Sequence, residues 1–183
     1  MKKEWLAIEA KSFYNAYLNL EMMNRSTGGV EFFVPMAVNG AFSIELALKA
    51  ILFEIGIPYE KEHNLLVLFN LLPERLQQIF WRYLACKAPE YADEKRRQDE
   101  LILISNVFVE WRYSFEGNPA PVFDSRFLSA FANTAIWVMF SLGINYDIIP
   151  GQKKETDEQI FEMIDQNRAE SLNRILEKVK KKQ

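Results

Sequence analysis

The stretch "PMAVNGAFSIELALKAILFEI", residues 35–55, decides the fold. Apolar side chains occupy most positions around the helix that this stretch would form, so water has almost no face to contact. A helix of this kind belongs in the interior of a bundle, where other helices cover every side of it. We therefore expect residues 35–55 to form the central helix of an all-α domain.

The rest of the chain has the same helical character, because apolar residues recur at spacings of three and four and alternating strand patterns are scarce. Long helices are expected over residues 3–23, 73–85, 93–116 and 125–143, and a short helix is expected after Asn64. Asn64 is predicted to cap the short helix, and Asp124 is predicted to cap the helix over residues 125–143. On the first helix, the predicted core side consists of Trp5, Ile8, Phe13, Ala16 and Leu20. The sequence thus predicts an antiparallel bundle of four to five long helices plus short helices over residues 1–145. A linker and a C-terminal amphipathic helical extension are expected over residues 146–183.

Composition and charge limit where the protein acts and what it binds. The chain has 183 residues, a net charge of −3 and one cysteine, Cys86. An acidic chain has no overall positive field to attract nucleic acid, so such binding would need a local patch. A single cysteine forms no intrachain disulfide, and the N-terminus lacks the apolar run of a signal peptide, so we predict a cytoplasmic protein. The uncharged residues 127–144 are predicted to form a buried helix rather than a membrane span.

Glu45 and Lys49 stand out because they interrupt the apolar central helix. They are four residues apart with the glutamate first, which is the favourable order for a helical ion pair. A buried charge left without its partner costs about 3–5 kcal/mol, so we expect the two side chains to pair. Glu110 and Arg112 are the candidates to join them from another helix, with Glu116 one turn beyond Arg112. Such a polar network would fix the register of the helices or, alternatively, serve catalysis.

The sequence offers little for metal or cofactor chemistry. One cysteine and one histidine, His63, leave no cluster at the spacing of metal ligands. The glycine-rich "STGGVEF", residues 26–32, lacks the Lys-Ser/Thr end of a phosphate-binding loop. We therefore predict neither a metal nor a cofactor, and His63 is interpreted first as a loop or cap residue before the short helix.

Three segments resemble a bacterial HEPN domain in their pattern and order. They are "SIELALKAIL" (residues 43–52), "HNLLVLFNLLP" (residues 63–73) and "FVEWRYSFE" (residues 108–116), and the resemblance spans roughly residues 34–139. It implies an all-α domain that works as a dimer. HEPN proteins include toxins of toxin–antitoxin systems, antiphage effectors, RNases, partners of nucleotidyltransferase proteins and non-catalytic members.

The catalytic signature of the family is an arginine followed, after four to six residues, by a histidine. Arg112 matches the arginine, but the corresponding histidine positions are occupied by Gly117, Asn118 and Pro119. The amide of Asn118 can hydrogen-bond to a phosphate or a ribose hydroxyl, but it cannot exchange a proton near neutral pH. General acid–base catalysis contributes about 10²–10⁴-fold in rate, so this departure weakens the case for a nuclease.

Two functions follow from these observations. The first is a non-catalytic HEPN-like module that dimerises and binds a protein or nucleic-acid partner, such as a nucleotidyltransferase protein or RNA, in stress or defence. The alternative is a metal-independent ribonuclease with a degenerate site, in which Arg112 holds the scissile phosphate and Asn118 or His63 assists. Such an enzyme would use the ribose 2′-hydroxyl as its nucleophile, which DNA lacks. The sequence leaves open whether the protein is an enzyme and favours the first function.

Overall fold

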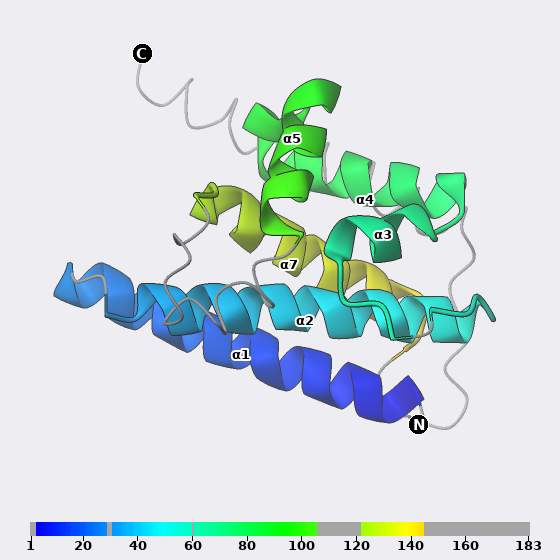
Figure 1. Cartoon of the computed structure of the whole chain (residues 1–183), viewed down its shortest axis with the longest axis horizontal. Helices are drawn as coiled ribbons and strands as arrows, with labels where there is room; N and C mark the ends of the chain where they lie inside the picture. The colour runs from blue at the N-terminus through cyan, green and yellow to red at the C-terminus, as the bar shows by residue number, and fades with distance from the viewer. Residues whose placement is uncertain (1–2, 29–30, 60, 106–121, 145–183) are drawn as a thin grey trace, which may run out of the picture.

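The computed structural model describes residues 3–28, 31–59, 61–105 and 122–144. All regular structure in these ranges is helical, which confirms the all-α class (Figure 1). In chain order the elements are α1 (Lys3–Thr27), α2 (Phe33–Glu54), α3 (Leu65–Asn70), α4 (Glu74–Lys87), the 3₁₀ helix η1 (Pro89–Tyr91), α5 (Glu94–Ile104) and α7 (Ser125–Ser141). The predicted extension over residues 146–183 lies outside the described residues.

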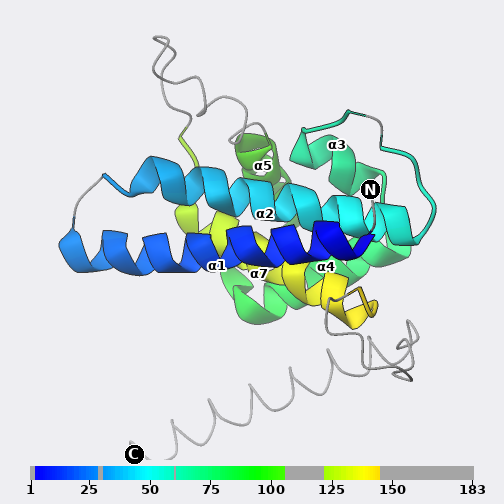
Figure 2. The same ribbon diagram turned by 90° about the horizontal axis from the view of Figure 1, so that it is seen from below.

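The helices are arranged around α2. Helices α1 and α2 form an antiparallel pair, and α7 covers another side of α2, running in the same direction as α2 (Figures 1 and 2). Helix α4 packs on the far side of α7, while α3 contacts both α2 and α5. Helix α2 is thus the central element, as its apolar circumference predicts.

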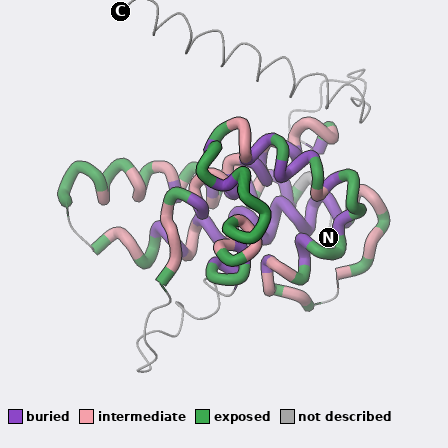
Figure 3. Tube along the Cα trace, turned by 90° about the horizontal axis from the view of Figure 1, so that it is seen from above, coloured by how far each residue is buried: buried purple, intermediate pink, exposed green. Residues whose placement is uncertain are grey.

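Burial along α2 follows from this position. Residues 43–52 are all buried, and the burial-coloured trace shows the same concentration of buried residues in the middle of the bundle (Figure 3). Among the described helices, only α2 is long and apolar enough to cross a membrane, and 78% of the relevant window is buried inside the protein. The central helix of a helical bundle has this composition because its environment is protein on every side.

Aromatic rings fill the space between α3, α4 and α7. The Phe69 ring lies 5.4 Å from that of Phe80, 4.7 Å from that of Trp81 and 5.6 Å from that of Phe131. The Phe69–Phe80 and Phe69–Phe131 contacts are edge-to-face, a favoured geometry for aromatic pairs. These contacts place the short α3 firmly against the two long helices.

At Gly40, both α1 and α7 approach α2 closely. A Cβ atom at this position would lie 3.0 Å from Cδ2 of Tyr17 and 3.2 Å from Cδ2 of Leu128. Both distances are shorter than ordinary carbon–carbon contacts. The missing side chain of Gly40 therefore allows two neighbouring helices to pack against the same spot on α2.

The predicted core side of α1 is wrong by about one position. Trp5 is 58% exposed, and Ile8, Phe13, Ala16 and Leu20 are only partly buried. The buried residues of α1 are instead Leu6, Ala7, Ala10, Tyr14 and Tyr17. Small alanines on this side let the backbone of α1 come close to α2, and this gain outweighs the burial of the larger Trp5 ring. Phe13 still packs edge-on against Phe42 of α2, with ring centres 4.5 Å apart.

The prediction of one uninterrupted helix over residues 93–116 is wrong at Ser105. Helix α5 ends at Ile104, and Ser105 lies in a turn, while residues 106–121 lie outside the described part. The Ser105 hydroxyl donates to the Ile102 carbonyl at 2.6 Å, and the Ser105 carbonyl accepts the backbone N–H of Leu65 at 3.1 Å. Ser105 thereby joins the end of α5 to the first turn of α3.

Candidate functional site

Glu45 and Lys49 form a buried ion pair on successive turns of α2. Glu45 is 1% exposed and Lys49 is 8% exposed, and Lys49 Nζ lies 2.7 Å from Glu45 Oε1. This is the contact that their spacing predicts. Two opposite charges in the interior must remain together, because separating them would leave each without compensation in a poorly polarisable environment.

The loop before α3 brings His63 to the same carboxylate. Nδ1 of His63 lies 2.8 Å from Oε1 of Glu45. The backbone here is fixed by Glu62, whose Oε1 accepts the N–H groups of His63 at 2.8 Å and Asn64 at 2.7 Å. Asn64 then caps α3, because its side chain accepts the N–H of Val67 at 3.1 Å. The predicted cap at Asn64 is thus confirmed. His63, the residue before this cap, also contacts Glu45 of α2.

We call Glu45, Lys49 and His63 the Glu45 cluster. Its carboxylate is buried, but the His63 side chain remains 52% exposed, so the cluster reaches from the core to the surface. Lys49 Nζ also lies 5.9 Å from the centre of the Tyr59 ring in the same loop. The second oxygen, Glu45 Oε2, is buried and accepts no hydrogen bond from the described residues. The cluster therefore links the loop before α3 to α2, and Glu45 Oε2 receives no hydrogen bond from the described residues.

Two chemical uses fit this arrangement. A carboxylate shared by an ammonium group and an imidazole can act purely as a structural tie between a loop and a helix. An imidazole held by a carboxylate and open to solvent can also serve as a general acid or base. The remaining predicted members of the site, Glu110, Arg112, Glu116 and Asn118, lie outside the described residues, so their participation stays a prediction.

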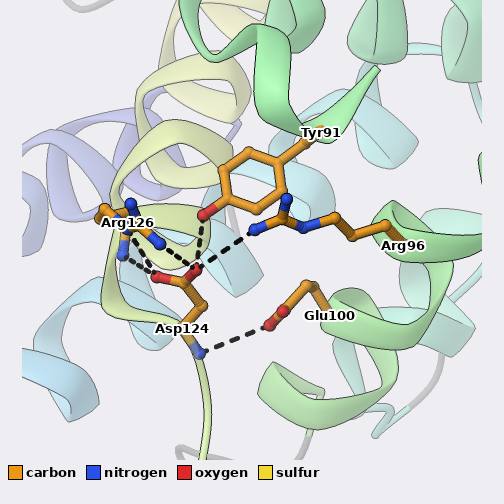
Figure 4. A network of polar contacts seen from close by, with 5 residues as sticks. All are labelled: Tyr91, Arg96, Glu100, Asp124 and Arg126. Atoms are coloured by element: carbon orange, nitrogen blue, oxygen red, sulfur yellow. Dashed lines mark hydrogen bonds and ion pairs between the residues drawn. The ribbon is translucent and has the colours of Figure 1, made fainter. Parts of the chain in front are cut away.

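A second polar network, centred on Asp124, was not predicted beyond the capping role of that residue (Figure 4). Asp124 caps α7 by accepting the Arg126 N–H at 2.9 Å, and its Oδ2 accepts the Tyr91 hydroxyl at 2.8 Å. The guanidinium groups of Arg126 and Arg96 lie 3.1 and 3.9 Å from the same oxygen. Glu100 Oε2 accepts the backbone N–H of Asp124 at 3.4 Å. The network joins η1 and α5 to the start of α7.

The network changes the acidity of its two central groups. Burial raises the pKa of Asp124, but hydrogen bonds from Arg126 and Tyr91 lower it by more, so the net pKa is below the ordinary value of 3.8. Burial, and then the hydrogen bond to Asp124, raise the pKa of the Tyr91 phenol well above its ordinary value. Asp124 is therefore ionised and Tyr91 protonated near neutral pH, as their hydrogen bond requires.

Within residues 3–28, 31–59, 61–105 and 122–144, no group of three or more His, Cys, Asp or Glu side chains is arranged to hold a metal ion.

Comparison with known proteins connects this geometry to a family. Neither the curated proteins nor the solved structures gave a significant match. A family model described as the HEPN domain matches residues 31–126, which is just over half of the 183-residue chain. The matched range contains α2 and the whole Glu45 cluster, and it ends at the Asp124 network. The chain belongs to the HEPN domain family.

Proposed function

We propose that the protein is a non-catalytic HEPN module that forms a homodimer and binds a protein or nucleic-acid partner. The observation that carries this proposal is the engagement of its single histidine, because His63 shares one oxygen of a buried carboxylate with Lys49. Where the family has the histidine of its catalytic signature, this chain has Gly117, Asn118 and Pro119. The polar centre of the domain then supports the fold, and function resides in surfaces that bind other molecules.

An exposed apolar surface on α3 and α5 supports the dimer. These two helices are in contact. Helix α3 exposes Val67 (42%), Leu71 directly after it is 36% exposed, and α5 exposes Ile102 (53%) and Leu103 (46%). Large apolar side chains that gather on neighbouring helices mark surfaces that other proteins cover. We call these four residues the α3–α5 surface and assign the homodimer contact to it.

The oligomeric state tests this assignment. Light scattering should give twice the 21.4 kDa mass of the chain. Replacing Ile102 and Leu103 by Glu should give the monomer, because charges would be buried in the contact. A matched control is Met22→Glu, which changes a residue 64% exposed on α1, away from this surface. A wild-type monomer, or dissociation by the control as well, would contradict the proposal.

Partner binding fits roles known for HEPN proteins, among them pairing with a nucleotidyltransferase protein in stress or defence. A cytoplasmic location is part of the same proposal and rests on the single cysteine, Cys86, which is free. Incubation with single-stranded RNA in the presence of EDTA separates this function from the enzymatic one. The non-catalytic module should leave the RNA intact.

A metal-independent ribonuclease is the second candidate, and one observation favours it. Half of the His63 side chain is open to solvent while Glu45 holds its Nδ1. In this candidate, Arg112 would hold the scissile phosphate, Asn118 would hydrogen-bond to it, and His63 would exchange the proton of the 2′-hydroxyl. The enzyme should then cleave RNA but not a 2′-O-methylated copy, and His63→Gln should lower the rate at least 100-fold. Intact RNA with the wild-type protein eliminates this candidate.

A further inference from the structure

A groove runs along α7 between α1 and α4. At the level of its floor, Asn133 of α7 donates to the Tyr14 hydroxyl of α1 at 2.9 Å, and Trp137 stacks on Tyr83 of α4 with ring centres 4.1 Å apart. Toward the start of α7 the groove widens into a pocket of about 460 Å³, which residues of α1, α4 and α7 line together. We call this feature the α7 groove.

The floor of the α7 groove has the spacing of a surface that accepts another helix. It consists of partly exposed residues of α7 that recur every three or four positions, namely Ala130, Asn133, Trp137 and Phe140. At about 100° per residue these side chains lie on one side of α7. Grooves of this kind bind the apolar side of an amphipathic helix. The helices of the described ranges leave this side of α7 partly open.

The chain leaves the described bundle at one end of this groove. The N–H of Gly143 donates to the Phe140 carbonyl at 2.8 Å, and the N–H of Ile144 donates to the Met139 carbonyl at 3.2 Å. Gly143 has a φ of 72°, the left-handed conformation that closes helices in this way. Ile144 is 1% exposed, so the chain is held against the core here. The residues that follow therefore start beside Phe140.

The sequence beyond this point supplies an apolar stripe of matching form. If residues 157–179 are helical, one side of this helix carries Ile160, Ile164, Leu172, Ile175 and Val179. The helix would be about 34 Å long, against about 25 Å for α7, so it could cover the whole floor. An amphipathic helix on its own is marginally stable in water, and it gains most of its stability by packing its apolar side against a partner.

The charges on the walls favour one orientation of this helix. Nζ of Lys11 lies 5.3 Å from the Tyr14 ring on α1, and Nζ of Lys87 lies 5.5 Å from the Tyr83 ring on α4. Residues 157–167 contain four carboxylates and no lysine or arginine. A helix that starts beside Phe140 and runs antiparallel to α7 brings this acidic half between the two lysines.

The opposite end of the α7 groove has the complementary charge. Glu90, which is exposed, lines the pocket near the start of α7. Residues 174–182 contain one arginine and four lysines against a single glutamate, and the antiparallel orientation brings them toward this end. Exposed ion pairs contribute only about 0–1 kcal/mol each, so the charges select the orientation while apolar burial supplies most of the stability.

We propose that residues 157–179 form an amphipathic helix that docks in the α7 groove of the same chain, antiparallel to α7. Its apolar stripe covers Ala130, Trp137 and Phe140, and its acidic half lies beside Lys11 and Lys87. The contact involves no residue of the Glu45 cluster or of the α3–α5 surface.

Hydrogen–deuterium exchange of the full chain, measured by mass spectrometry, tests the docking. Peptides from residues 157–179 should exchange at least about tenfold more slowly than an unstructured chain. Ile164→Asp should remove most of this protection, because it places a charge in the apolar contact. The matched control is Asn173→Asp, which adds the same charge on the opposite side of the proposed helix and should leave the protection unchanged.

Two changes in the groove show whether the protection comes from α7. Ala130→Glu places a long charged side chain on the floor and should speed exchange of residues 157–179 about tenfold. Lys87→Glu changes an exposed side chain on the wall and should speed it about two- to fivefold. The matched control is Lys95→Glu on α5, outside the groove, which should behave as the wild type does.

A reciprocal measurement follows the groove itself and needs no change there. The NMR signal of the Trp137 indole N–H should shift in Ile164→Asp and stay in place in Asn173→Asp. The proposal is overturned if residues 157–179 exchange as an unstructured chain does in the wild-type protein, or if both groove variants keep the full protection. Protection that is lost on dilution to the monomer would assign the helix to the groove of a second chain and overturn docking within one chain.

Discussion

His63 Nδ1 lies 2.8 Å from Glu45 Oε1, although 18 residues separate them in the chain. This contact crosses from the surface loop before α3 to the most buried part of α2. The Glu45 carboxylate thus compensates the charge of Lys49 and also holds the loop in position. The stability of the domain should therefore depend more on Glu45 than on any exposed acidic residue.

Replacing Glu45 by Gln should lower the free energy of unfolding by about 3–5 kcal/mol, because Lys49 would keep a buried charge without its partner. Urea unfolding followed by circular dichroism measures this loss. The matched control is Glu21→Gln, which breaks the Glu21–Arg25 pair at the same spacing, where the Arg25 side chain is 76% exposed. That change should cost about 0.5 kcal/mol or less. Equal losses in the two variants would contradict the prediction.

The double variant Glu45→Gln/Lys49→Met should recover much of the stability lost in Glu45→Gln. Methionine removes the buried charge and keeps a flexible apolar chain of similar length. If the double variant is less stable than Glu45→Gln, Lys49 has a stabilising partner other than Glu45. The same urea unfolding experiment decides between the two outcomes.

Gly40→Ala should destabilise the bundle, although alanine is a better helix former than glycine by about 1 kcal/mol. The added methyl group would lie 3.0 Å from Tyr17 and 3.2 Å from Leu128, so α1 or α7 must shift. Crowding of this kind costs about 1–3 kcal/mol, so we expect a lower melting temperature. Differential scanning calorimetry measures it, and a higher melting temperature would show that the three helices separate easily.

The Asp124 network should make stability depend on pH in the acid range. The pKa of Asp124 is lower in the folded chain than its ordinary value of 3.8, so the folded state favours the ionised carboxylate. Its contribution is fully present above pH 3.8 and is lost as the pH falls through the folded pKa. Asp124→Asn keeps an N-cap side chain but removes the charge, so this variant should be less stable than the wild type at pH 7. The difference should shrink below pH 3.8 in thermal unfolding measured over this range.

Tyr91→Phe should show how much of the Asp124 network depends on one hydroxyl. The variant keeps the ring that packs at 5.0 Å against Phe127 but removes the donor to Asp124. We expect a loss of about 0.5–1.5 kcal/mol, the usual net value of one hydrogen bond. In addition, the pKa of Asp124 should rise, and NMR titration of its carboxyl carbon measures this shift. An unchanged carboxyl pKa would mean that Arg126 alone sets it.

Short-range patterns predicted much of the fold. The apolar circumference of residues 35–55 predicts a central helix, and Asn64 and Asp124 predict caps, because these signals depend on neighbours within one or two turns. The Glu45–Lys49 contact follows from spacing in the same way. The core side of α1 was missed because small alanines, rather than Trp5, face α2. Which side of α1 faces α2 depends on how closely the two helices approach. The residues within a few turns of one helix do not determine this distance.

Contacts between distant segments could not be predicted from the sequence, for a related reason. Tyr91 and Asp124 are 33 residues apart, and His63 and Glu45 are 18 residues apart, with no periodic pattern to link either pair. Helix α5 ends at Ile104, and the next residue, Ser105, accepts a hydrogen bond from the backbone N–H of Leu65, which joins two separate helices. Each of these features arises only when the bundle has assembled.

The position of Gly40 and Glu45 on the same helix has a consequence for how the gene can change. Five residues separate them, and at about 100° per residue they point to different sides of α2, one toward α1 and α7 and the other toward the His63 loop. Inserting or deleting a single codon between them would rotate one half of the helix against the other. Natural variants of this domain should therefore tolerate substitutions in this interval far better than changes in its length.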